Sequence, residues 1–192
     1  MVELTSQKRR AWIGPVVGIF IIALMFVFWA GTSFWFGVFR MHSPTRYSEA
    51  IANLKYAYVA ETSYFSETAR YEESVEQVGF LPERSNRYRY IFSPTGDSFS
   101  PGDPPDGGAH TGVLADTVKY PTANNALLLS GIPPALLSTA GIDSTGITII
   151  AAGDIDSDPP IDVWSISTNN RIIDGGVVQA GIPFRHVNDT ED

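Results

Sequence analysis

Residues 11–39 read AWIGPVVGIFIIALMFVFWAGTSFWFGVF and contain no Asp, Glu, Lys, Arg or His. As an α-helix rising ~1.5 Å per residue, this stretch would be roughly 40 Å long, more than the ~30 Å hydrocarbon core of a bilayer. We therefore expect a single N-terminal transmembrane helix over residues 11–41, in contact with the lipid bilayer. The rest of the chain is long enough to form one domain with its own core.

Three basic residues at positions 8–10 precede this apolar stretch. The apolar region of a secretory signal peptide usually has about 7–15 residues and ends at a small-x-small cleavage site. The present stretch is longer and ends in large aromatic residues, which favours a retained anchor over a cleaved signal. The positive-inside rule then makes residues 1–10 a cytoplasmic tail and places residues 42–192 on the far side of the membrane.

The composition excludes several classes of protein. The chain has no cysteine, which rules out disulfides, cysteine-ligated zinc and iron–sulfur sites. After Phe39 there are 10 basic and 20 acidic residues, so we expect no binding to nucleic acid by charge, whereas a basic periplasmic partner protein is permitted. No nucleophile-elbow, zinc-protease, P-loop or dinucleotide-binding motif is present, and the three histidines (His42, His110, His186) are scattered. We do not expect an enzyme.

Ser43-Pro44 resembles an N-cap followed by proline at the first helical position, so either a second helix begins here or the first helix continues through a kink. The apolar residues that follow recur at spacings typical of one helical face, and the pattern stops near residues 69–71. The members of this stripe are Tyr47, Ile51, Leu54, Tyr58 and Phe65.

Strand patterns follow the second helix. Residues 86–92 alternate, which places Arg87 and Arg89 on a solvated face opposite two tyrosines. Short helical turns are expected within 126–137, and residues 147–152 and 161–167 form the strands of a β-hairpin. The polar tail at 184–192 is expected to lie on the surface.

The loop of this hairpin contains the one concentration of candidate ligands. Its carboxylates are Asp154, Asp156 and Asp158, and Asp162 follows at the start of the next strand. Oxygen ligands in flexible geometry suit Ca²⁺, and the spacing does not match an EF-hand, which requires Gly and Glu where this loop has Pro159 and Ser165. A calcium-binding loop is one interpretation; an acidic turn that keeps the surface soluble is the other.

Two parts of the chain resemble type IV pilins and pseudopilins of the deltaproteobacterial and myxobacterial kind. The first is YSEAIANLKYAYVAETSYFSETARYEESVEQVGFLPERSNRYRYIF, at residues 47–92, and the second is AAGDIDSDPPIDVWSIS, at residues 151–167. This resemblance implies an α+β fold in which a long helix packs on an antiparallel sheet. It also implies a bacterial inner membrane as the location, with residues 42–192 as a pilin-like periplasmic domain.

The start of the chain lacks a recognisable prepilin peptidase motif. The resemblance implies a glutamate at the fifth position after the cleavage glycine, yet no acid follows Gly14 or Gly18 at the required spacing. Our main expectation is therefore a non-enzymatic accessory subunit of a larger membrane complex, such as a respiratory or photosynthetic one, that packs its anchor against other integral membrane subunits. The alternative is a divergent type IV pilin or pseudopilin that forms a filament or secretion apparatus.

Overall fold

The computed structural model describes Met25 and residues 43–102, 109–155 and 161–188. The chain separates into two compact units, Met1–Pro44 and Thr45–Asp192. The predicted tail at 1–10 and nearly all of the predicted transmembrane helix at 11–41 lie outside the described residues, so both stay predictions. In the part of the chain that is described, no helix is both long and apolar enough to cross a membrane.

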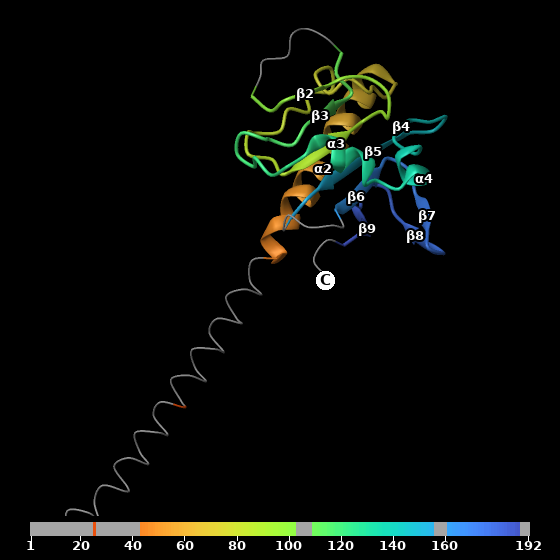
Figure 1. The fold of residues 1–192 in the computed structure, drawn as a ribbon. Helices are drawn as coiled ribbons and strands as arrows, with labels where there is room; N and C mark the ends of the chain where they lie inside the picture. The colour runs from red at the N-terminus through yellow and green to blue at the C-terminus, as the bar shows by residue number, and fades with distance from the viewer. Residues whose placement is uncertain (1–24, 26–42, 103–108, 156–160, 189–192) are drawn as a thin grey trace, which may run out of the picture. The chain divides into compact units, whose positions relative to one another are not determined.

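Helix α2 (Ser43–Thr68) provides one wall of the core (Figure 1). Its fully buried residues recur every three or four positions and therefore share one face: Ala50, Leu54, Ala57 and Glu61. The alanines carry little bulk, so the helix backbone can approach the sheet closely. The predicted second helix is confirmed, and the larger stripe residues Tyr47, Ile51 and Tyr58 flank this face half-buried.

The end of helix α2 differs in one respect from the predicted stripe. Phe65 was expected in the core but is 41% exposed and stacks on Tyr71, with ring centroids 4.5 Å apart. Phe65 therefore lies at the edge of the packed face of α2, near the end of the helix. The helix stops because Ala69 adopts φ of 56°, a left-handed conformation, and its amide donates to the Phe65 carbonyl at 2.8 Å.

The helix packs on an antiparallel sheet. In the described residues the strand order is β2-β3-β1-β5-β6-β9, with β4 also paired to β5; β2 and β3 run parallel and the other pairs are antiparallel. The strands are β1 (Tyr88–Ile91), β2 (Ser98–Phe99), β3 (Gly112–Val113), β4 (Gly141–Ile142), β5 (Ile147–Gly153), β6 (Asp162–Ser167) and β9 (Phe184–Val187). A separate hairpin is formed by β7 (Arg171–Ile173) and β8 (Gly176–Val178).

Both faces of the central strands are covered. Every residue of β5 and β6 is buried, and alternate side chains join two different clusters. Tyr88, Tyr90 and Trp164 pack toward α2, whereas Ile150 and Val163 pack toward the short helices α3 (Asn125–Ser130) and α4 (Pro134–Leu137). The predicted helical turns are thus confirmed as the second layer on the sheet.

This second layer corrects the prediction of a solvated face on β1. Arg89 is half-buried, and its guanidinium donates to the Asn125 carbonyl of α3 at 3.1 Å and to the Ser98 hydroxyl at 3.3 Å. Burial lowers the pKa of Arg89 below its usual value. The sequence showed the alternation correctly but gave no sign that α3 would cover the arginine side.

Candidate functional site

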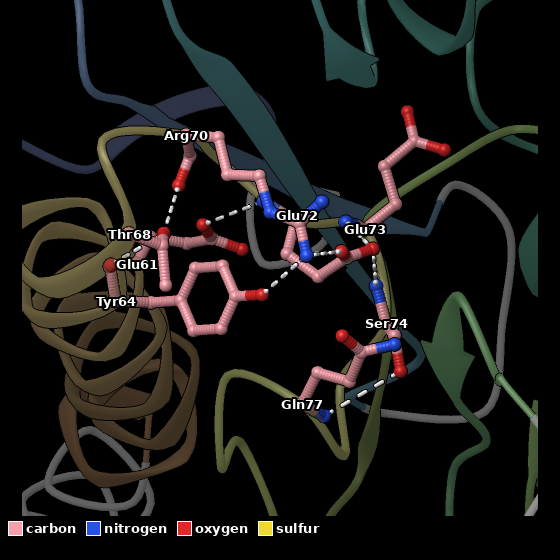
Figure 2. Close-up of polar contacts among 8 residues, drawn as sticks. All are labelled: Glu61, Tyr64, Thr68, Arg70, Glu72, Glu73, Ser74 and Gln77. Atoms are coloured by element: carbon pink, nitrogen blue, oxygen red, sulfur yellow. Dashed lines mark hydrogen bonds and ion pairs between the residues drawn. The ribbon is translucent and has the colours of Figure 1, made fainter.

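The C-terminal part of helix α2 carries a buried acid. The side chain of Glu61 has no solvent exposure, and its Oε2 accepts a hydrogen bond of 3.4 Å from the Glu72 amide (Figure 2). Oε1 is buried and has no hydrogen-bond partner among the described residues. Since Glu61 continues the spacing of Leu54 and Ala57, the helix phase itself directs this carboxyl toward the core.

The chain after the helix turns back over Glu61. We call residues 69–76 the strap. The Glu72 carboxylate organises it by accepting hydrogen bonds from the amides of Glu73 at 3.1 Å and Ser74 at 3.3 Å (Figure 2). Arg70 lies 3.9 Å from the same carboxylate and donates to the Tyr64 hydroxyl at 3.2 Å. The strap is therefore held by its own carboxylates and by the last turns of α2.

The environment of Glu61 favours the protonated acid. The pKa of Glu61 is raised to about 8, mainly by burial and to a smaller extent by the negative charges of Glu72 and Glu73, while the hydrogen bond from the Glu72 amide acts in the opposite direction. Sequence reasoning missed this residue. The signal was available, because a glutamate in phase with a buried apolar stripe must be buried too.

Asp162, the last of the four predicted calcium ligands, lies in a different network. Its Oδ2 accepts from the Tyr88 hydroxyl at 2.6 Å and from the Trp164 indole at 2.5 Å, and its Oδ1 accepts from Arg185 Nε at 2.6 Å. The carboxylate is completely buried. Both oxygens are thus used by protein donors, and Asp162 has a structural role that joins β1, β6 and β9.

Aromatic rings complete this network. The Arg185 guanidinium lies 5.2 Å from the centroid of Tyr47 and 5.4 Å from that of Trp164, and the two rings stack on each other at 6.0 Å. Tyr47 stands near the start of α2, whereas Arg185 belongs to the last strand. The cluster therefore connects the beginning of the helix to the C-terminal strand.

The remaining predicted ligands are only partly described. Asp154 is half-buried at the end of β5, and Asp156 and Asp158 lie outside the described residues. Among the described residues, no group of three or more His, Asp or Glu side chains is arranged to hold a metal ion. The calcium site stays a prediction.

Two histidines lie in separate polar contacts. His110 Nδ1 is 2.5 Å from Glu76 Oε1, and the His110 amide donates to the other oxygen of the same carboxylate at 3.1 Å. His186 Nε2 is 2.7 Å from the Ser165 hydroxyl, and burial together with the charge of Arg171 lowers the pKa of His186 to about 4. His42 lies outside the described residues. These pairs hold loops and strands together.

The face of α2 opposite the buried stripe is exposed. Ala52, Val59, Ser63 and Ser66 recur at spacings of seven, four and three, and so share this face. Val59 is 57% exposed. Lys55 and Tyr56, one turn before Val59, are exposed as well, so the outer side of the helix carries small, charged and aromatic side chains.

The fold and this open helix face define a structural α+β domain, in which a long helix packs on an antiparallel sheet and leaves its outer side available for contacts. Residues 41–162 match the family described as Type IV pilin PilA. The chain belongs to the type IV pilin PilA family.

One relative with a similar name matches a part of this chain. The chain is 44% identical over 54 residues to the Type IV major pilin protein PilA of Myxococcus xanthus (strain DK1622), over 28% of this chain and 24% of that protein. The chain therefore aligns with about a quarter of the length of this relative. The resemblance deduced from the sequence is confirmed by both comparisons.

Proposed function

We propose that this chain is a structural, non-enzymatic type IV pilin or pseudopilin that assembles with further copies into a filament or secretion apparatus. The family match over residues 41–162 carries this proposal. The relative in Myxococcus xanthus bears the name of a major pilin. The comparisons do not support the accessory subunit of a respiratory or photosynthetic complex that we expected first, and they favour the alternative.

The proposed orientation in the membrane rests on the sequence alone. We propose that residues 11–41 anchor the chain in a bacterial inner membrane, with residues 1–10 in the cytoplasm and residues 42–192 in the periplasm. The anchor would contact lipid and the helices of other integral membrane subunits. The excess of acidic residues after Phe39 supports contact with basic periplasmic proteins and disfavours nucleic acid.

The exposed face of α2 is the surface that we assign to contacts between subunits. Val59 lies on it, on the side of the helix opposite the residues that pack on the sheet. A helix in this position can be covered by another subunit without disturbing its own core. The matched region of the family includes the whole of this helix.

Replacing Val59 with glutamate is expected to reduce filament yield by about tenfold or more, because an unpaired charge would be buried between subunits. The domain itself should keep its stability, since the position faces solvent. Full-length variants would be expressed in a host with type IV pilus machinery but without its own major pilin, and sheared filaments would be counted by electron microscopy.

Val118→Glu is the matched control. This valine is 93% exposed and lies in a loop away from the helix, so the variant should assemble like the unmodified chain. Filaments from Val59→Glu at the unmodified level would exclude this face as a contact. A lack of filaments from the unmodified chain, despite normal expression, would count against the proposed function itself.

The calcium-binding loop also remains a proposal, now for Asp154, Asp156 and Asp158, with Asp162 engaged elsewhere. Carboxylates crowded in one loop repel each other, and a divalent cation would relieve this repulsion. A saturating excess of calcium is expected to raise the Tm by several degrees over a chelator, as a bound ion stabilises only the folded state. Equal melting temperatures in calcium and chelator would remove the proposal.

A further inference from the structure

The buried carboxyl group of Glu61 has few hydrogen-bond partners. Oε1 is buried without a hydrogen-bond partner in the part of the chain that the structure describes, and Oε2 accepts one long hydrogen bond from the strap. Within the described residues, no ion pair joins Glu61 to a cation. A charged carboxylate in such a place would be far more unfavourable than a neutral carboxylic acid, which needs much less solvation.

The charged groups around Glu61 add to this effect. From the strap, Glu72 and Glu73 both act on it with negative charge, and the cation Arg70 is engaged with Glu72 and the Tyr64 hydroxyl. The buried phenols of the sheet have partners elsewhere, and neither is among the groups whose charge acts on Glu61: Tyr88 donates to Asp162, and Tyr90 accepts from Asn53 at 2.8 Å. Both phenols are neutral, because burial raises the pKa of each above its usual value.

We propose that Glu61 is buried as the neutral acid, and that loss of its proton loosens the strap from helix α2. The Glu72 amide contacts the Glu61 carboxyl, so the strap sits directly over the group that would become charged (Figure 2). This hydrogen bond by itself favours the charged form, but burial and the negative charges of Glu72 and Glu73 outweigh it, so an ionised Glu61 would repel the strap. The strap is also tied to the sheet, because Glu73 Oε1 accepts from the Ile142 amide at 3.0 Å. This device does not depend on the assembly function proposed above.

The direction of the pH effect follows from burial. The folded chain keeps the Glu61 proton up to about pH 8, whereas the unfolded chain releases it near the ordinary value of 4.5. Between these values the folded state binds more protons than the unfolded state, so its stability falls as pH rises. Below pH 4.5 the folded state has the full stability that the Glu61 proton contributes, and above about pH 8 this contribution is lost completely.

Direct titration tests the protonation state. The full-length chain, labelled with ¹³C at glutamate carboxyls and kept in mild detergent, would be followed by NMR from pH 3 to pH 10, and Glu61→Gln would identify the resonance by its absence. We expect the Glu61 carboxyl to titrate near pH 8. A midpoint in the ordinary range near 4.5 would overturn the proposal, even if the variant failed to fold.

Stability measurements test the consequence. The unfolding constant of the unmodified chain, divided by that of Glu61→Gln, is expected to rise by up to about tenfold per pH unit between about pH 5 and pH 8 and then to level off. Glu67→Gln, at an exposed glutamate of the same helix, is the control and should give a flat ratio. A flat ratio for Glu61→Gln as well would contradict the proposal.

Hydrogen exchange at the Glu73 and Ser74 amides locates the effect. Both amides donate to Glu72 within the strap. After correction for the intrinsic exchange rate, their protection should fall between pH 6 and pH 9 in the unmodified chain and stay constant in Glu61→Gln. Equal loss of protection in both proteins would show that the proton does not control the strap.

Discussion

Replacing Asp162 with alanine is expected to lower the free energy of unfolding by about 3–5 kcal/mol, as found when one partner of a buried ion pair is removed. The Asp162 carboxylate is the common acceptor for Tyr88, Trp164 and Arg185. Without it, a guanidinium that is only 21% exposed keeps its charge and loses its counterion. Chemical denaturation followed by circular dichroism measures the loss.

Two further variants identify the cause. Arg185→Ala should produce a loss of similar size by leaving the acid unpaired, and the double variant should lose much less than the sum, because the two residues form one unit. Asp174→Asn is the control: Asp174 is exposed with φ of 52°, a conformation that asparagine also tolerates, and its effect should stay within about 0.5 kcal/mol. Additive losses would argue against a coupled network.

Replacing Phe80 with alanine is the second change with a large expected effect, about 3–5 kcal/mol. The Phe80 ring is fully buried and contacts three other rings, with centroids 5.1 Å from Phe92 and 5.4 Å from Tyr90 and Tyr56. The alanine would leave a cavity between α2 and the sheet that these rigid rings cannot fill.

The adjacent Leu81 offers a matched control. It is 47% exposed, so Leu81→Ala should change the free energy of unfolding by about 0.5 kcal/mol or less. Both variants would be compared in the same denaturant series. A small effect of Phe80→Ala would mean that the aromatic cluster rearranges around the missing ring.

Periodicity predicted the elements whose buried residues are regularly spaced. The second helix, the strands at 147–152 and 161–167 and the helical turns before them all have long or strongly apolar patterns, and the structure contains each of them. The hairpin β7–β8 and the last strand were missed. Phe184–Val187 reads FRHV, with two polar residues, and was expected to be a surface tail; it pairs with β6 because Arg185 and His186 find partners there.

The polar contacts were harder to deduce than the elements. Asp162 was grouped with the acidic loop because of its sequence neighbours, whereas its partners come from strands 74 and 23 residues away. Glu61 was quoted only as part of a family resemblance. Its burial follows from the phase of the helix. The strap that covers it depends on the left-handed conformation of Ala69, which an alanine in the sequence does not predict.

The link between Tyr47 and Arg185 has a consequence for the order in which the domain can mature. The helix emerges early during synthesis, yet Arg185, which is both the counterion for Asp162 and the cation over the Tyr47 ring, arrives with the final strand. Until that strand is inserted, the inner carboxylate has no opposing charge and β6 presents an unpaired edge. The domain therefore keeps an exposed sheet edge, to which another chain could pair, until its last residues have been added.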